Sequence, residues 1–138
     1  MKIVIDANRI IAAVIKNSTT RLILTDENFE FITPDFTITE LEEHKEEIKT
    51  KLKISDRELK LLFELIFENI IVLPSEEYAE FEEKTMNDIR DPDDVSYLAA
   101  CIATNAAGIW THDPDFLEQK KVKVFTNIDM LKMSRGEA

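Results

Sequence analysis

The chain opens on a short run of mostly β-branched residues, Lys2-Ile3-Val4-Ile5, and Asp6 follows this run directly. Similar short runs recur at Glu30–Thr33, Ile70–Leu73, Ile109–Thr111 and Val122–Phe125. Longer segments with helical patterns separate them. This alternation is typical of α/β domains, in which strands pair in parallel and helices cover both faces of the sheet. We therefore predict one domain over residues 1–138, with three α/β/α layers around a mainly parallel five-stranded sheet.

The segments between the first three runs have the periodicity and end signals of helices. The stretch Ala7–Leu24 carries apolar residues at helical spacing and is predicted to break near Asn17–Thr20. A charged helix is predicted over about Thr39–Lys53. Ser55 and Glu58 then have the spacing of a capping box at the start of a leucine-rich helix. We expect these last two helices to form a hairpin beside the sheet.

Two further helices are predicted in the second half of the chain. Pro74-Ser75 precedes a helix over Glu76–Asp88, whose exposed face is densely acidic. Pro92 suits the first turn of the next helix, and the apolar segment Val95–Ala106 is expected to form its body. Gly108 lies where a glycine commonly ends a helix.

The composition limits the sites and partners that the chain can have. Its 138 residues include 28 Asp and Glu against 17 Lys and Arg, which gives a formal net charge of −11. The single cysteine, Cys101, excludes a disulfide framework within one chain and suits a reducing compartment. The acidity argues against a basic nucleic-acid surface and against docking on an anionic membrane. Because the opening apolar run is short and no long apolar stretch follows, we expect a cytoplasmic protein without a leader or a membrane span.

The acidic residues fall into two groups. Most alternate with lysine on helix faces, as over Glu42–Glu47, and such faces are typically solvated. A smaller group falls at the ends of predicted strands. Asp6 follows the first run, and Asp113 and Asp115 follow Ile109–Thr111. These side chains should lie at the carboxyl edge of a parallel sheet, which is where α/β sheets bind their ligands.

Two acidic residues on helices are predicted to reach the same edge. Glu40 and Asp94 each lie in the first turn of a predicted helix that follows a strand or its loop. The converging carboxylates would be those of Asp6, Glu40, Asp94 and Asp113. They repel one another, and a divalent cation relieves the repulsion. Oxygen ligands favour Mg²⁺ or Mn²⁺ over zinc. Taken alone, Asp6 has an alternative explanation as a helix cap, and Asp94 as an acid that the helix dipole favours.

Four short motifs follow one another in the chain. They are Ile3-Val4-Ile5-Asp6-Ala7-Asn8, Thr39-Glu40-Leu41, Asp94-Val95-Ser96-Tyr97-Leu98-Ala99-Ala100 and Trp110-Thr111-His112-Asp113-Pro114-Asp115-Phe116. In order and separation they resemble the four motifs of PIN domains. These domains are metal-dependent nucleases, and the family includes the VapC toxins of prokaryotic toxin–antitoxin pairs. The resemblance covers nearly the whole chain.

The resemblance implies a role for each matching residue. The four acids that would hold one or two Mg²⁺ or Mn²⁺ ions are Asp6, Glu40, Asp94 and Asp113. Asp115 matches a fifth acidic position, while Asn8 and Thr111 match polar positions that orient the first and last acids. Asp91 and Asp93 flank the third motif, and we select the acid that directly precedes the apolar helix.

The resemblance also implies a substrate and partners. PIN nucleases of this kind cleave single-stranded RNA, and Arg9, Arg90 and Lys120–Lys123 are the basic residues expected to contact it. His112 is an RNA contact, a proton carrier or simply a loop residue. A VapC-like protein is expected to form a homodimer and to bind an antitoxin; the apolar face of Leu59–Phe67 would either pair two copies or lie in the core. The alternative is a PIN fold that binds RNA or a protein without cutting.

Overall fold

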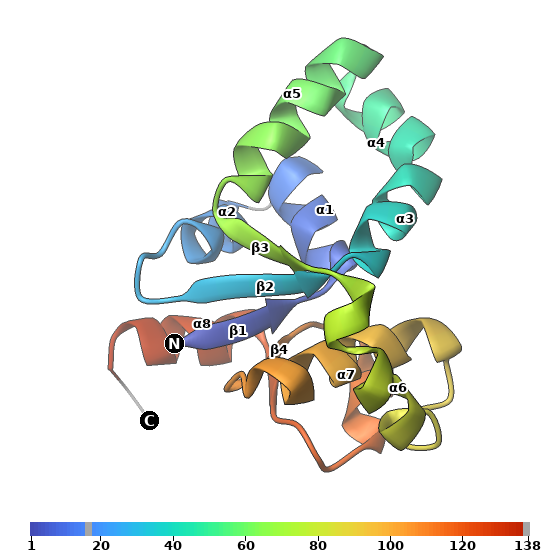
Figure 1. The fold of residues 1–138 in the computed structure, drawn as a ribbon. Helices are drawn as coiled ribbons and strands as arrows, with labels where there is room; N and C mark the ends of the chain where they lie inside the picture. The colour runs from blue at the N-terminus through green and yellow to red at the C-terminus, as the bar shows by residue number, and fades with distance from the viewer. Residues whose placement is uncertain (16–17, 137–138) are drawn as a thin grey trace.

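The computed structural model of the chain describes residues 1–15 and 18–136 (Figure 1). Within these residues the sheet has five strands in the order β3-β2-β1-β4-β5, and every neighbouring pair is parallel. The strands are β1 (Lys2–Ile5), β2 (Glu30–Pro34), β3 (Ile70–Leu73), β4 (Gly108–Trp110) and β5 (Val124–Phe125). Helices cover both faces, which confirms the predicted three-layer α/β/α fold.

Each face of the sheet has its own core, because alternate residues of a strand point to opposite faces. Ile3 and Ile5 of β1 pack with the helices α1 (Ala7–Ile15) and α2 (Ser18–Leu24) and with Met130 of α8 (Asn127–Ser134). Val4 of β1 packs on the opposite side, in a core that contains Phe116 and the buried residues of α7 (Pro92–Thr104); α6 (Ala79–Thr85) packs on α7. Ile3, Val4 and Ile5 of the central strand β1 are therefore fully buried.

The first crossover has two helices, as the sequence predicts. α1 and α2 pack against each other, and α2 begins at Ser18, within the stretch where the break is predicted. Asn17, the first residue of that predicted break, lies outside the described residues.

The second crossover confirms the predicted helical hairpin but not its first boundary. It consists of α3 (Phe36–Glu43), α4 (Lys45–Leu52) and α5 (Asp56–Phe67), and Figure 1 shows it projecting beyond the sheet above α1. The predicted start at Thr39 is wrong by three residues, and His44 interrupts the helix that was predicted to be continuous. The capping box between Ser55 and Glu58 is present. A small separate core of Val14, Ile48 and Leu59 joins the hairpin to α1.

The third crossover differs from the prediction at both ends. The helix predicted over Glu76–Asp88 is a 3₁₀ turn, η1 (Ser75–Glu77), followed by the shorter α6. α7 (Pro92–Thr104) begins with Pro92 at its first position, as predicted, and Asn105 caps its end in the left-handed conformation. Gly108 is not the helix stop. It lies in β4, where a Cβ atom would meet the Phe125 ring at 2.5 Å, so glycine is required by the close approach of β5.

The last elements are short. A second 3₁₀ turn, η2 (Pro114–Glu118), leads to β5, which is two residues shorter than predicted because the Val122 N–H is bonded to the Gln119 side chain at 2.9 Å. None of the helices in the described part of the chain has the length and apolar character that a membrane span requires.

Candidate active site

The carboxyl edge of the sheet brings the predicted acids together from four elements. β1 and β4 are neighbours in register, so Asp6 and Thr111, which directly follow them, lie side by side. α3 brings Glu40 to this edge, and the first turn of α7 brings Asp94. Electrostatic repulsion links Asp6 to Asp113, and Asp94 to both Asp113 and Glu40. One charged neighbourhood therefore includes all four acids of the predicted quartet.

Asp6 is buried and tightly held. The Thr111 hydroxyl donates a hydrogen bond to Oδ2 of Asp6, and the Arg9 backbone N–H donates to Oδ1 at 2.8 Å. The second bond caps α1, so the capping explanation and the metal-site prediction concern the same side chain. Burial raises the pKa of Asp6 to about 6, against the opposing effect of these two hydrogen bonds. Asp6 is thus fixed in position, with the positive charge of Arg9 beside it.

Asp94 is the acid with the least satisfied side chain. It lies at the third position of α7 with a side chain that is 8% exposed, and its Oδ2 atom has no hydrogen-bond partner in the part of the chain that the structure describes. Burial, and then repulsion from Asp113 and Asp91, raises the pKa of Asp94 to about 7. A buried carboxylate oxygen without a partner costs free energy unless a cation or donor approaches it.

Asp91, Asp94 and Asp115 form the tightest group of carboxylates. One oxygen from each lies within 4.8 Å of the other two. Asp91 caps α7 by accepting the Asp93 N–H at 2.9 Å, and Asp113 holds η2 in the same way by accepting the Asp115 N–H at 2.9 Å. Asp91 was not among the predicted ligands. Its signal was the proline that follows it, because Pro92 at the first helical position makes Asp91 the cap and puts it in the same turn as Asp94.

Glu40 lies in the middle of α3, so the prediction of a first-turn position is wrong. It is half-buried, and the Tyr97 hydroxyl donates to its Oε1 atom. Burial raises the pKa of Glu40, and the hydrogen bond from Tyr97 opposes this effect. The α3 helix starts early because its first turn is anchored, with the Thr37 hydroxyl buried between Thr33 and Tyr97.

A chain of hydroxyl groups connects Glu40 to the backbone of β1. Thr33 contacts the Ile5 carbonyl at 2.9 Å and Thr37 at 2.6 Å, Thr37 contacts Tyr97 at 3.0 Å, and Tyr97 reaches Glu40. Three hydroxyl groups supply three protons, but the chain has four contacts between two acceptors. Because Thr33 donates to Ile5, Thr37 donates to Tyr97 and Tyr97 donates to Glu40, the contact between Thr33 and Thr37 is the one left without a proton.

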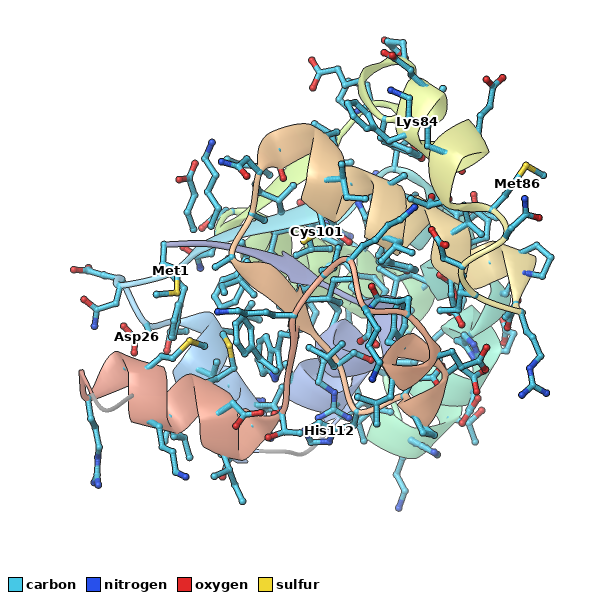
Figure 2. The ribbon with its side chains drawn as sticks, turned by 90° about the horizontal axis from the view of Figure 1, so that it is seen from below. Met1, Asp26, Lys84, Met86, Cys101 and His112 are labelled. Atoms are coloured by element: carbon cyan, nitrogen blue, oxygen red, sulfur yellow. The ribbon has the colours of Figure 1, made fainter. Side chains whose placement is uncertain are left out.

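His112 forms a hydrogen bond with the first residue of α8. Its Nε2 atom accepts the Asn127 backbone N–H at 3.0 Å, and Figure 2 shows it beside the N-terminal end of α8. Burial and the neighbouring Arg9 lower the pKa of His112, so the neutral, accepting form is favoured. This contact supports the loop-residue explanation of His112.

The predicted RNA-contacting basic residues are scattered around the site. Arg9 is half-buried beside Asp6, and burial lowers its pKa. Arg90 is well exposed and lies 3.6 Å from Glu118. Lys121 pairs with Asp88 at 2.8 Å, so only part of Lys120–Lys123 faces solvent without an ion pair among the described residues. Asn8 is exposed in the first turn of α1, close to Asp6 in sequence.

The donor set fits a hard divalent cation. The converging side chains are all carboxylates, two of them are buried with raised pKa values, and one buried oxygen has no partner. Mg²⁺ and Mn²⁺ prefer carboxylate oxygens, and either ion would offset the burial and the repulsion that raise the pKa values. Asp91, Asp94 and Asp115 each bring one oxygen within 4.8 Å of the other two. Asp113 and Glu40 repel Asp94, and Asp113 also repels Asp6, so these three acids adjoin the same group.

The family of the protein follows from its sequence taken as a whole. A model of the PIN domain matches residues 4–129. The chain belongs to the PIN domain family. PIN domains are generally nucleases that use divalent metal ions, and a cluster of three acidic residues capable of binding one is present here. No curated protein matched the chain.

A solved structure has the same fold. A chain of the crystal structure of VapBC2 from Rickettsia felis, bound to a DNA fragment from their promoter, superposes with a TM-score of 0.66 at 15% sequence identity. The match covers 91% of this chain and 98% of the other. The likeness confirms the PIN-like fold that the motifs predict.

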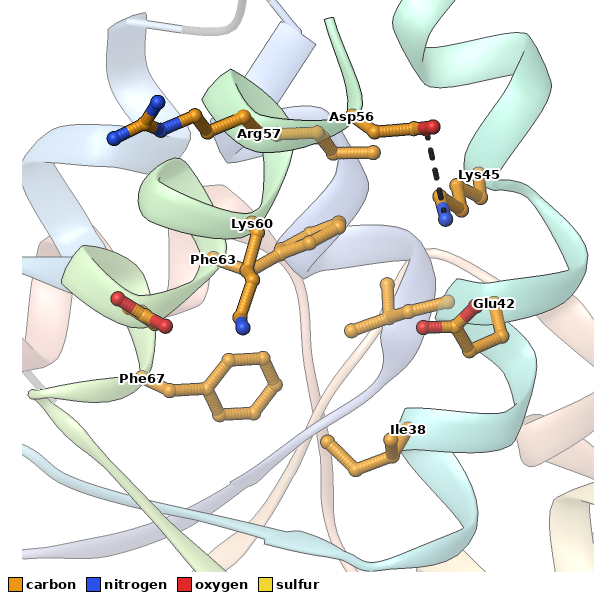
Figure 3. Close-up of a pocket in the computed structure, with 11 residues that line it drawn as sticks. Ile38, Glu42, Lys45, Asp56, Arg57, Lys60, Phe63 and Phe67 are labelled. Carbon is orange, nitrogen blue, oxygen red and sulfur yellow. Dashed lines mark ion pairs between the residues drawn. The ribbon is translucent and has the colours of Figure 1, made fainter.

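A second surface lies away from the acids. The helical hairpin encloses an apolar groove of about 590 Å³ between α3 and α5, and Figure 3 shows Ile38, Phe63 and Phe67 facing it. Lys45 and Asp56 form an ion pair of 3.6 Å at one end. On the outer side of α5, Leu61 and Leu65 are more than half exposed, whereas Leu59 is buried in the core. The face predicted over Leu59–Phe67 therefore contributes to both core and surface.

Proposed function

We propose that the protein is a Mg²⁺- or Mn²⁺-dependent endoribonuclease that hydrolyses phosphodiester bonds of single-stranded RNA. The observation that carries this proposal is the buried Oδ2 atom of Asp94, which has no hydrogen-bond partner among the described residues and lies among carboxylates at the edge where β1 and β4 end. The PIN family supports nuclease chemistry, and the resemblance to VapC supports RNA as the substrate.

The carboxylates of the site and the residues that hold them have different roles in this proposal. When bound, a divalent ion neutralises charge on the phosphate and activates a water molecule for in-line attack. Asp6 and Asp94 would hold such an ion, with Asp91, Asp113 and Asp115 as further oxygen donors. Thr111 holds Asp6 in one orientation, and Tyr97 does the same for Glu40.

Glu40 and Arg9 have roles of their own in this proposal. Glu40, with its raised pKa, is suited to exchange a proton with water or with the leaving oxygen. Arg9 lies beside Asp6 and would attract the phosphate group.

The experiment that tests this proposal is a cleavage assay on a mixed pool of single-stranded RNA with Mn²⁺, with EDTA, and with an Asp94→Asn variant. We expect Mn²⁺-dependent cleavage that EDTA and Asp94→Asn both abolish. The matched control is Asp56→Asn, since Asp56 is an exposed acid of the hairpin. The metal site is tested separately by thermal unfolding: an ion that binds the folded state must raise the melting temperature of the wild type and not of Asp94→Asn. Cleavage that survives EDTA or Asp94→Asn would refute the proposal.

A second proposed function is binding of a protein partner at the apolar groove of the hairpin. Grooves of this kind take the apolar face of an amphipathic helix, and the groove is separate from the acids. The similar solved structure contains VapBC2, and the resemblance to VapC supports an antitoxin as the partner. The exposed Leu61 and Leu65 support a homodimer across α5.

Copurification with the product of an adjacent gene tests the partner. Wild type should retain the partner, and Phe67→Glu should lose it while keeping its RNA cleavage. Sedimentation of Leu61→Glu tests the dimer, because a charge at a paired apolar face favours the monomer. A monomeric wild type would refute the dimer, and partner binding unchanged in Phe67→Glu would refute the groove.

A further inference from the structure

A second hollow lies beside the acidic edge, at the carboxyl ends of β2 and β3. It has a volume of about 650 Å³. The residues that line it and bear on its chemistry are Asp35, Phe36, Ser75, Tyr78, Glu82 and Ser96. Figure 1 shows how they meet: the segment after β3 passes the start of α3 and leads to α6, which packs on α7.

The hollow and the candidate active site share two helices. Thr39 lines the hollow and directly precedes Glu40 on α3. Ser96 lines it from α7 and directly precedes Tyr97, whose hydroxyl holds Glu40. A nucleotide strand with its phosphate at the acids therefore has its neighbouring nucleotide within reach of this hollow.

The negative charge of the hollow favours binding of a neutral base over binding of a phosphate group. Two of its side chains, Asp35 and Glu82, are carboxylates that repel an anion. Carboxylates accept hydrogen bonds and donate none, so they suit a neutral group that presents N–H donors. The half-buried ring of Phe36 adds an aromatic side chain of the type on which unpaired bases stack.

Asp35 and Glu82 differ in how many lone pairs they have free to accept hydrogen bonds from a ligand. Asp35 accepts the Ser75 N–H at 3.0 Å on one oxygen and the Tyr78 hydroxyl on the other, so it holds the segment after β3 in place. Glu82 accepts the Ser96 hydroxyl at 3.0 Å through Oε2 alone. This bond fixes the direction of the Glu82 side chain, and its other lone pairs remain for a ligand.

We propose that this hollow binds a nucleobase of the RNA next to the cleaved phosphate, and that Glu82 determines which base it takes. Guanine fits best, because its Watson–Crick edge presents two adjacent N–H donors to one carboxylate. The inference rests on the proposed RNA substrate, and it adds a specificity-determining residue to that function.

The test measures binding without cleavage. Fluorescence anisotropy, with Ca²⁺ in place of Mn²⁺, compares labelled oligouridylates that carry a single guanine, adenine or cytosine with oligouridylate itself. A good bidentate contact to a base discriminates by roughly tenfold. We expect wild type to bind the guanine oligomer about tenfold more tightly than oligouridylate, and Glu82→Gln to lose this preference. Glu83→Gln, an exposed neighbour on the same helix, should keep it.

The outcomes separate this inference from the proposed nuclease activity. Equal affinity of the wild type for all oligomers, no binding at all, or an unchanged preference in Glu82→Gln would each overturn the base pocket. A guanine preference that Glu82→Gln removes, in a protein that does not cleave RNA with Mn²⁺, would support the pocket and refute the nuclease. If Glu82→Gln lowers the melting temperature, Ser96→Ala is the second variant. It removes the anchor of Glu82 without removing the charge, and it should also weaken the preference.

Discussion

Two acidic regions of this protein have opposite electrostatic properties. On the hairpin, Asp56 lies 2.6 Å from Lys49, and Glu47 lies 3.1 Å from Lys51. These lysines lower the pKa of both carboxyl groups. At the carboxyl edge of the sheet, burial raises the pKa of Asp6 and Asp94 instead.

The difference shows that acid content alone does not identify a site. Both regions are dense in Asp and Glu, but the hairpin acids are exposed and neutralised by lysine from the same or the adjacent helix. At the edge, Asp6 and Asp94 are buried, and the neighbouring carboxylates repel Asp94. We therefore expect a divalent cation to bind at the carboxyl edge of the sheet and not on the hairpin.

The largest expected effect is the loss of activity in Asp6→Asn. The amide oxygen can still accept the Arg9 N–H, and the amide NH₂ group can donate to the Thr111 hydroxyl oxygen in place of the bond that Asp6 accepts. The fold should therefore persist, but the charge that holds a cation is gone. We expect Mn²⁺-dependent RNA cleavage to fall by about 10³-fold or more. Single-turnover cleavage rates measure it. Activity within tenfold of the wild type would remove Asp6 from the site.

The next effect is on the pH dependence of stability without metal. Since the pKa of Asp6 rises from 3.8 to about 6 and that of Asp94 to about 7, the folded protein binds more protons than the unfolded chain between about pH 4 and 7. The free energy of unfolding therefore falls as the pH rises through this window. For Asp6 the change corresponds to about 3 kcal/mol.

Denaturant unfolding in EDTA measures this dependence. Asp6→Asn should flatten it and be at least as stable as the wild type at pH 7, whereas Asp56→Asn should leave its slope in this window unchanged. A metal-free wild type that gains stability from pH 4 to 7 would contradict the raised pKa values.

A smaller effect is expected when the support of Asp6 is removed. Thr111→Val deletes the hydroxyl that donates to Asp6 but keeps a β-branched side chain after β4. Loss of such an orienting group weakens metal binding or activity by roughly 10- to 100-fold. Titration of the melting temperature with Mn²⁺ measures the affinity, with Thr50→Val on the exposed face of α4 as the control. The same affinity in Thr111→Val as in the wild type would mean that Asp6 is held by the backbone alone.

The smallest effect is expected on the hairpin. Asp56→Asn removes the partner of Lys49 and Lys45, but exposed ion pairs add little to stability and salt screens them. We expect a slight fall in melting temperature that disappears at high salt, with no change in the response to Mn²⁺. If Asp56→Asn abolished that response, the distinction between the two acidic regions would be wrong.

The elements whose signals are local were predicted well. Lys2–Ile5 and Ile70–Leu73 are strands with the predicted bounds, and the capping box at Ser55 starts α5. The errors occur where tertiary contacts override local preference. Phe36-Thr37-Ile38-Thr39 is rich in β-branched residues, which disfavour helix, yet it is helical because Thr37 is buried between Thr33 and Tyr97.

Pro92 and Gly108 show the same contrast between a local signal and a tertiary contact. Pro92 marks the start of α7 as predicted, because the missing N–H and fixed backbone angle act locally. Gly108 was predicted to stop a helix, and only the close approach of Phe125 and Lys123 shows that glycine is needed there in a strand.

The sequence by itself determined the parallel α/β fold, the family and the acids that follow strands, because periodicity and strand-end position are local properties of the chain. Only the tertiary structure decided the rest. It grouped Asp91 with Asp94 and Asp115, left one oxygen of Asp94 without a partner, and set Glu82 beside Ser96 in the adjoining hollow. The physical reason is that burial, the pKa of a carboxyl group and the satisfaction of its oxygens depend on residues that are distant in the chain.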